Sequence, residues 1–131
     1  IERINQGIMP IYEPGLVELV TRNVEARRLH FSTGLSSAVT NADVVFIAVG
    51  TPSGEDGAAD LKAITQVAQQ LGSYLSNYAI IIDKSTVPVY TAHKVEELIH
   101  QQFVKRGLSC QFDVISNPEF LKEGSAVSDF M

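Results

Sequence analysis

The stretch DVVFIAVGTPS, residues 43–53, decides the fold of this chain. Its apolar part is continuous rather than alternating, and Gly, Thr, Pro and Ser follow it at once. Two later stretches share this design, AIIIDKSTVP at residues 79–88 and FDVISNPE at residues 112–119. Continuous β-branched runs of this length are typical of parallel strands that helices cover on both faces. We therefore expect strands at residues 29–32, 44–49, 79–83 and 112–116.

Helical periodicity fills the segments between these strands. Apolar residues recur every three or four positions over residues 61–75 and 92–103. Asp60 is of a type that favours helix N-caps, and Gly107 stands where a helix C-terminus is expected. An earlier helix is expected over residues 14–28, with Pro14 in its first turn. Strands that alternate with helices predict an α/β fold with a parallel sheet.

The composition indicates one ordinary folded domain. The 131 residues are 45% hydrophobic, and 10 basic against 15 acidic side chains give a net charge of −5. The basic residues are scattered, which disfavours nucleic acid and anionic membranes as partners. The single cysteine, Cys110, excludes an internal disulfide, so we expect a reducing, cytoplasmic location.

The beginning of the sequence and its apolar runs also bear on location. No apolar run approaches the roughly 20 residues that a membrane helix needs, so we expect no membrane segment. The sequence opens at Ile1 without a methionine or an apolar leader. We therefore expect no signal peptide and a natural start that lies further upstream.

Polar loops follow the last three expected strands, residues 44–49, 79–83 and 112–116. Ligands of open parallel sheets bind outside the carboxyl ends of the strands, so these loops form the candidate site. GTPS at 50–53 leads into the acidic loop 54–57, STVP occupies 85–88, and NPEFLKEG occupies 117–124. We expect the three loops to lie at one edge of the sheet.

Each loop is open to two interpretations. GTPS can be an ordinary turn, and Ser85 with Thr86 can cap the next helix rather than serve a ligand. Glu119 and Glu123 are four residues apart, so they share a face if they lie on a helical turn. Such a pair is either a solvated acidic edge or a general base and acceptor that hold a water and a substrate hydroxyl. The clustering of three polar loops favours a ligand site.

Other residues are weaker candidates. His93 and His100 stand seven residues apart on one expected helix, too far to share a metal, and we predict no metal site. Cys110 has no neighbouring cation, so we interpret it as structural. The nine glycines never form GxG, which begins the usual dinucleotide-binding turn. Either the chain binds no dinucleotide, or the part that binds it is missing.

Five blocks keep a fixed order and spacing along the whole chain. They are PIYEPGL (10–16), FIAVGTPS (46–53), DGAADL (56–61), DKSTVPV (83–89) and SNPEFLKEGSAVSDF (116–130). Together they resemble the nucleotide-sugar dehydrogenases, and the spacing from GTPS to DGAADL is most similar to the UDP-glucose branch. The resemblance implies that residues 1–131 form a partial Rossmann-like, doubly wound parallel sheet. This partial domain would lack the first two strands and the GxGxxG turn, and no second domain is expected.

The resemblance implies an NAD-dependent oxidation of a sugar C6 alcohol. In this family two hydrides pass to two NAD molecules through a thioester on a cysteine, which water then hydrolyses. The expected reaction converts UDP-glucose to UDP-glucuronate. The alternatives are another nucleotide sugar such as GDP-mannose, or a non-catalytic remnant that serves binding or assembly. Because the GxGxxG turn and the reactive cysteine would lie outside this sequence, we expect the chain alone to be inactive and to bind NAD weakly.

The resemblance also implies roles for residues of this chain. Thr86 would hold a catalytic water or a polar substrate group, Glu119 would act in general acid/base chemistry, and PIYEPGL would shape the mouth of the site. The expected contacts to NAD are Val49, Gly50, Thr51, Pro52, Ser53, Ser85 and Glu123. The expected contacts to the nucleotide-sugar substrate are Glu119, Phe120, Leu121, Lys122 and Glu123.

Two positions depart from the family pattern, and one edge of the sheet is expected to be incomplete. Tyr90 stands where many relatives have glycine, and Lys122 lies at a variable position. Without the first two strands, strand 44–49 would present unpaired backbone. We therefore expect a homo-oligomer, with strand exchange, a moved first strand or aggregation in the isolated chain.

Overall fold

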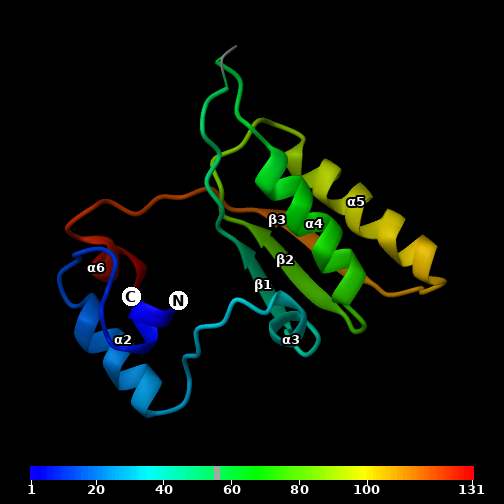
Figure 1. Cartoon of the computed structure of the whole chain (residues 1–131). Helices are drawn as coiled ribbons and strands as arrows, with labels where there is room; N and C mark the ends of the chain where they lie inside the picture. The colour runs from blue at the N-terminus through cyan, green and yellow to red at the C-terminus, as the bar shows by residue number, and fades with distance from the viewer. Residues whose placement is uncertain (55–56) are drawn as a thin grey trace. The chain divides into compact units, whose positions relative to one another are not determined.

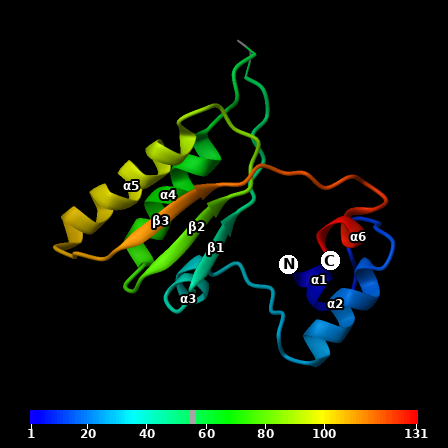
Figure 2. The ribbon, with the colours of Figure 1, turned by 180° about the vertical axis from the view of Figure 1, so that it is seen from behind.

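The computed structural model describes residues 1–54 and 57–131. These residues form two compact units: Gly34–Glu119 is the larger, and the smaller combines Ile1–Thr33 with Phe120–Met131. Figure 1 and Figure 2 show the elements of each unit from opposite sides. Glu55 and Asp56, which belong to the acidic loop and to the DGAADL block, lie outside the described residues.

A three-stranded parallel sheet forms the centre of the larger unit. Its strands, in their spatial order, are β1 (Val44–Ile47), β2 (Ala79–Asp83) and β3 (Phe112–Ser116). Phe46 pairs with Ile82, which in turn pairs with Ile115. The predicted α/β class is confirmed. The bounds of β2 and β3 agree with the prediction, whereas β1 ends two residues before the predicted Val49.

Helices connect the parallel strands, as a parallel sheet requires. They are α4 (Lys62–Tyr74) and α5 (Thr91–Arg106), and the short α3 (Leu35–Val39) precedes β1. Asp60 Oδ1 accepts the backbone N–H of Lys62 at 2.9 Å and so satisfies one donor at the start of α4. At the other end of the unit, α5 stops at Gly107, whose φ of 65° lies in the left-handed region that glycine adopts readily. Gly107 acts as predicted, whereas the N-cap of α4 is Leu61, one residue after the predicted Asp60.

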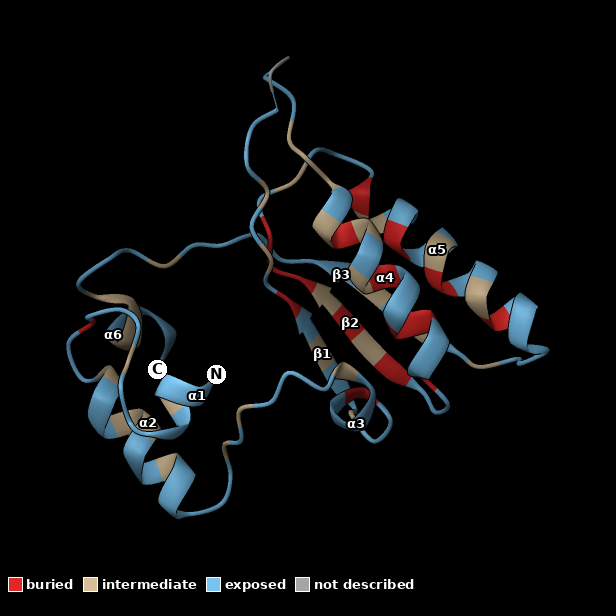
Figure 3. Cartoon of the chain, in the orientation of Figure 1, coloured by how far each residue is buried: buried red, intermediate tan, exposed pale blue. Residues whose placement is uncertain are grey.

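The core of the larger unit lies between the sheet and a layer formed by α4 and α5. The two helices lie side by side on one face of the sheet (Figure 1), and buried residues line their inner surfaces (Figure 3). Phe103 of α5 meets Phe112 of β3 edge to face, with ring centroids 5.5 Å apart. Burial of apolar area is the main favourable contribution to folding. The buried core also includes Ile64, Ala68, Leu71, Leu75, Ala79, Ile81, Val95 and Ile99.

The opposite face of the sheet differs from the prediction. Val44, Phe46 and Ile115 are 45%, 55% and 45% exposed, although they belong to the apolar part of their strands. Successive strand residues point to opposite faces of the sheet. Both α4 and α5 lie on one face (Figure 1), so the residues on the other face are not covered by these helices. The prediction that the three strands are buried on both faces is therefore wrong for the described residues.

The smaller unit is helical. Its helices are α1 (Glu2–Asn5), α2 (Leu16–Glu25) and α6 (Ala126–Phe130). α2 lies within the predicted span 14–28 and follows Gly15, whose φ of 79° is left-handed. Pro14 consequently precedes the helix instead of lying in its first turn, because the chain must turn at Gly15 before the helical hydrogen bonds begin.

The predicted strand at residues 29–32 does not form. The backbone there has no regular structure. A strand needs a hydrogen-bonded neighbour, and in the described part of the chain the sheet consists of β1, β2 and β3. The local sequence favours an extended conformation, but no neighbouring strand is present to pair with it.

Candidate functional site

Ser85 joins the loops that follow β1 and β2. Its hydroxyl donates to the carbonyl oxygen of Val49 at 3.0 Å and accepts the backbone N–H of Val49 at 3.2 Å. Ser85 is 6% exposed. The backbone of Val49 therefore pairs with a side chain of the β2 loop instead of with another strand.

Thr51 makes a second link between these two loops. Its hydroxyl donates to the carbonyl oxygen of Thr86 at 2.9 Å. Thr86 itself is exposed. The backbone of the β2 loop is thus fixed by its neighbour, while the Thr86 side chain is accessible at the carboxyl end of the strand.

Lys84 joins the end of β2 to the loop that follows β3. Its Nζ donates to the carbonyl oxygen of Pro118 at 3.2 Å and lies 3.8 Å from Oε1 of Glu119. The backbone N–H of Asn117 also donates to the carbonyl oxygen of Asp83 at 2.9 Å. Together with the links made by Ser85 and Thr51, these contacts bring residues 117–119 of the third loop to the same edge as the other two loops, as the sequence predicted for this part of the loop.

Asp83 is a buried carboxyl at this edge. The residue is 1% exposed, its Oδ1 accepts the backbone N–H of Ser85 at 3.1 Å, and its Oδ2 has no hydrogen-bond partner among the described residues. Burial raises the pKa of Asp83 above its ordinary value, while the hydrogen bonds from Ser85 act in the opposite direction. Burial has this effect because the charged carboxylate loses contact with water, which disfavours the charged form.

The predicted site residues divide between the two units. The larger unit holds Val49, Gly50, Thr51, Pro52, Ser53, Ser85, Thr86 and Glu119. The smaller unit holds Phe120, Leu121, Lys122 and Glu123. Contacts within the larger unit link the loops that carry the first group, and the roles assigned to each residue remain predictions.

Glu119 and Glu123 do not share a helical turn. The backbone has no regular structure from Asn117 to Lys122, and turn conformation begins only at Glu123. Instead, the Lys84 ammonium group binds Asn117 Oδ1 and the carbonyl oxygen of Pro118 and holds this segment at the end of β2. The four-residue spacing therefore does not place these side chains on one face in the way that the sequence suggested.

Two residues that the sequence analysis did not single out organise the loops. One is Lys84, and the other is Glu13, whose Oε2 accepts the N–H of Gly124 at 2.9 Å and whose Oε1 accepts the N–H of Ala126 at 2.8 Å. Glu13 is buried, and it thereby fixes the start of α6 directly after the segment 120–123. The sequence signals that could have identified them are an acidic residue directly before the Pro-Gly turn of PIYEPGL and a lysine directly after a buried strand.

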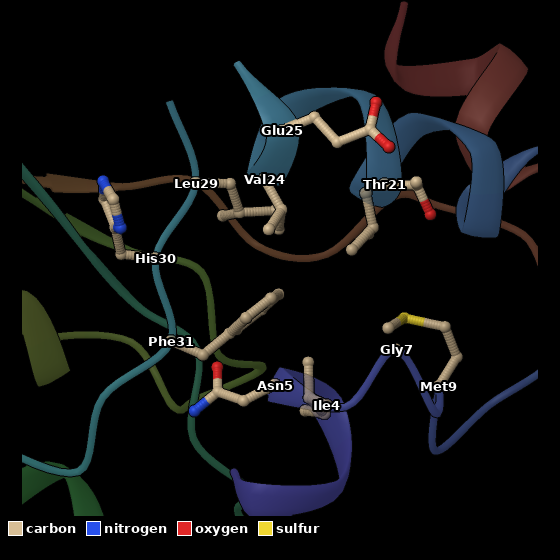
Figure 4. Close-up of a pocket in the computed structure, with 11 residues that line it drawn as sticks. Ile4, Asn5, Gly7, Met9, Thr21, Val24, Glu25, Leu29, His30 and Phe31 are labelled. Carbon is tan, nitrogen blue, oxygen red and sulfur yellow. The ribbon is translucent and has the colours of Figure 1, made fainter. Parts of the chain in front are cut away.

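A cavity of about 280 Å³ lies within the smaller unit (Figure 4). Its apolar lining comes from α1, α2 and the segment after α2, with Ile4, Val24 and Phe31 among the contributors. None of the predicted site residues lines it. The cavity is therefore separate from the loops that carry the candidate chemistry.

The described residues also bear on metal binding and on membrane insertion. Among residues 1–54 and 57–131, no group of three His, Cys, Asp or Glu side chains is arranged to hold a metal ion. No helix in the described part of the chain has the length and apolar character needed to cross a bilayer.

Known proteins resemble this chain along its full length. The model of the UDP-glucose/GDP-mannose dehydrogenase family, NAD binding domain, matches residues 1–131. A UDP-glucose 6-dehydrogenase of Pseudomonas aeruginosa is 52% identical over 130 residues, which cover 99% of this chain and 29% of that protein. The chain thus spans less than a third of the length of this curated relative.

Solved structures show the same relationship. A UDP-glucose dehydrogenase from Pyrobaculum islandicum is 40% identical with a TM-score of 0.85, over 99% of this chain and 30% of that one. A GDP-mannose dehydrogenase from Pseudomonas aeruginosa, solved as a ternary complex, is 38% identical with a TM-score of 0.89, again over 99% and 30%. The predicted Rossmann-like class is confirmed by these dehydrogenase structures.

The geometry fits a domain that contributes part of an NAD site. Three parallel strands end at one edge, where open α/β sheets bind nucleotides, and buried side chains fix the loops there. The chain itself has no GxGxxG turn for a pyrophosphate. NAD is the cofactor of the domain that the matching model describes. This chain belongs to the UDP-glucose/GDP-mannose dehydrogenase family, and it matches the NAD-binding domain of that family.

Proposed function

We propose that this chain is part of an NAD-dependent UDP-glucose 6-dehydrogenase, which oxidises UDP-glucose to UDP-glucuronate in two hydride transfers. The observation that carries the proposal is the 52% identity to a UDP-glucose 6-dehydrogenase over almost the whole chain. The joined loops of the larger unit supply a site at the edge where such a domain binds its ligands.

The exposed residues of this edge would meet the ligands. Thr86 would hold a water or a polar group of the substrate, and the half-exposed carboxylate of Glu119 would transfer a proton when water attacks the thioester. The residues proposed to contact NAD are Val49, Gly50, Thr51, Pro52, Ser53, Ser85 and Glu123. Those proposed to contact the nucleotide sugar are Glu119, Phe120, Leu121, Lys122 and Glu123.

NAD, when bound, supplies the acceptor for hydride from the sugar carbon. The residues of this chain would contribute shape and proton transfer. Because the hydroxyls of Ser85 and Thr51 already bind backbone groups, these two side chains would act mainly by fixing the wall of the NAD site. Glu119 is the group at this edge that could exchange a proton with water.

The decisive experiment uses the complete reading frame that contains this chain. The purified product should form NADH from UDP-glucose and NAD and release UDP-glucuronate, with two NADH for each product. The isolated chain should do neither, and calorimetry should detect only weak NAD binding because the pyrophosphate turn is absent. Micromolar NAD binding by the isolated chain would contradict the proposed division of the site.

A related dehydrogenase is the second candidate. It is favoured by the GDP-mannose dehydrogenase structure, which has a TM-score of 0.89 to this chain. Activity of the complete protein on GDP-mannose but not on UDP-glucose would select it. No activity on any nucleotide sugar would instead favour a non-catalytic remnant that serves binding or assembly.

The role of Glu119 is tested by a matched pair of substitutions. Glu119→Gln in the complete protein should lower kcat by roughly 10²- to 10⁴-fold, since it removes a general acid/base and keeps the shape of the side chain. Glu96→Gln on α5, an exposed site in the same unit, should leave kcat unchanged. Equal activity of the two variants would exclude Glu119 from proton transfer.

We also propose that the protein is a cytoplasmic homo-oligomer. The exposed apolar residues on the open face of the sheet, including Phe46 and Ile115, support association of the isolated chain, as does the edge strand β1. Light scattering after size-exclusion chromatography should therefore show a species larger than a monomer. A stable monomer would rule out this form of self-association.

A further inference from the structure

Lys84 links the ends of all three strands. Its backbone N–H donates to the carbonyl oxygen of Ile47, the last residue of β1, at 2.8 Å. It is the first residue after β2, and its Nζ donates to the carbonyl oxygen of Pro118 beyond β3. One residue thus fixes the β1 end through its main chain and the β3 loop through its side chain.

The side chain of Lys84 is held where it is by polar partners. It is 9% exposed, so its ammonium group has lost most of its contact with water. Such burial is unfavourable unless acceptors replace the water. The acceptors are the Pro118 carbonyl oxygen at 3.2 Å, the Asn117 Oδ1 at 3.4 Å and the Glu119 carboxylate at 3.8 Å. These three groups come from consecutive residues.

The same contacts restrict Glu119. The residues around it have no helical or strand hydrogen bonds to define their course. The buried ammonium group attracts the Glu119 carboxylate and also binds the backbone one residue earlier. Because the Glu119 side chain is 46% exposed, this attraction limits its direction while leaving it open to a ligand.

An exposed pair on the same unit shows what distinguishes Lys84. Lys62 Nζ lies 3.6 Å from Asp60 Oδ2, a distance similar to that between Lys84 and Glu119. The Lys62 side chain, however, is 92% exposed. Surface ion pairs of this kind contribute little, since water screens the charges and holding a long exposed side chain in one conformation costs entropy. Lys62 is therefore a matched control with the same charge and a similar ion-pair distance.

We propose that Lys84 is a positioning residue for Glu119: its buried ammonium group holds the loop 117–119 against the end of β2 and directs the carboxylate toward the reacting group. The inference rests on the proposed function, in which Glu119 transfers a proton. Lys84 contacts neither substrate nor NAD in this proposal, so it acts through Glu119.

The test compares Lys84→Met, Lys84→Arg and Lys62→Met in the complete protein. Lys84→Met removes the charge and keeps the length of the side chain. Because misplacement of an acid/base group slows the reaction, kcat should fall at least about 10-fold, while the KM for NAD should change less than about 2-fold. Lys84→Arg should restore most of kcat, since it keeps the charge and the donors. Lys62→Met should behave as the wild type.

Two kinetic outcomes would overturn the proposal. One is an unchanged kcat in Lys84→Met. The other is a folded Lys84→Arg protein that loses as much kcat as Lys84→Met, because the charge would then not be what matters. The arginine variant also decides the question if Lys84→Met fails to fold.

A second measurement separates this proposal from the proposed function. Hydrogen exchange of the Asn117 amide, which donates to the carbonyl oxygen of Asp83, should be faster in Lys84→Met than in Lys62→Met, and this readout needs no activity. If the wild type is inactive on every nucleotide sugar but exchange accelerates as expected, the proposed function fails and the positioning contact stands. If exchange is unchanged in Lys84→Met, the positioning role of Lys84 is refuted whether or not the enzyme is active.

Discussion

The close approach of α4 and α5 at Gly72 makes a strong quantitative prediction. A Cβ added at Gly72 would lie 2.7 Å from Cβ of Gln102, 2.8 Å from the carbonyl oxygen of Ile99 and 2.9 Å from Cα of Ile99. Carbon atoms in good contact are about 3.5–4.0 Å apart. Two of the three atoms belong to the backbone of α5, so no change of side-chain rotamer relieves the clash.

Two effects of Gly72→Ala oppose each other. Alanine favours a helix over glycine by about 1 kcal/mol. Against this gain, α5 would have to move by roughly 0.8 Å to restore a normal contact with the new methyl group. Such overpacking typically costs about 1–3 kcal/mol, and more where the backbone must shift. The layer that would move contains Leu71 and Ile99, which are fully buried. Because the backbone must shift, we take the upper part of this range, about 2–3 kcal/mol, and with the gain of about 1 kcal/mol we expect a net loss of about 1–2 kcal/mol in the free energy of unfolding.

Ser73→Ala is the control for this prediction. Ser73 is the next residue of α4 and is exposed, so alanine there gains helix propensity with no clash and should stabilise by a few tenths of a kcal/mol, roughly 0.3–0.5. Urea unfolding followed by circular dichroism measures both variants. Opposite signs at two adjacent positions are the expected result. If Gly72→Ala is as stable as the wild type or more stable, α4 and α5 do not approach each other as closely at Gly72 as described.

Three further predictions concern buried or strained groups. Glu13→Ala should destabilise the smaller unit by about 2–4 kcal/mol, because two backbone N–H groups lose the buried carboxylate that accepts them. Proteolysis of residues 120–131 should accelerate, and an unchanged rate of proteolysis would contradict the contact. Asp83→Asn tests pH dependence: since burial raises the pKa of Asp83 in the folded state above 3.8, wild-type stability should fall as pH rises from about 4 through the raised value, and the variant should lack that fall. Equal pH slopes in urea titrations of both proteins would refute this assignment. Tyr90→Gly should stabilise the protein by roughly 0.5 kcal/mol. Tyr90 has a φ of 73°, and glycine relieves about 1 kcal/mol of backbone strain there, which exceeds the loss of the tyrosine ring's stacking on His93. A lower melting temperature would contradict this prediction.

Local patterns predicted the elements that local forces decide. The bounds of β2 and β3 follow from short β-branched runs, and the end of α5 follows from Gly107. The strand expected at residues 29–32 has the alternating apolar and polar pattern of a strand, LHFS, and yet stays irregular. β2 and β3 pair with neighbouring strands that lie far away in the sequence, whereas residues 29–32 have no such partner in the described part of the chain. A short local window of sequence does not contain this information.

The site was predictable at the level of loops but not of contacts. Parallel topology alone implies that the residues after each strand meet, and the links through Ser85 and Lys84 agree with this. The contacts of Glu13 with Gly124 and Ala126 span more than 100 residues along the chain, so no periodicity or spacing reveals them. The expected helical turn with Glu119 and Glu123 failed because spacing indicates a shared face only where a helix exists.

Burial separates two kinds of polar residue at the carboxyl edge of the sheet. Ser85 and Lys84 are buried and use their side chains on the backbone of neighbouring loops, whereas Thr86 and Glu119 are exposed. A buried residue that already binds the backbone has little capacity left for a ligand, so its loss should change the positions of the loops. An exposed residue on a fixed loop can meet a ligand without a conformational change, and its loss should change the chemistry alone. Substitutions of the first kind should therefore alter hydrogen exchange and kcat together, while substitutions of the second kind should alter kcat with exchange unchanged.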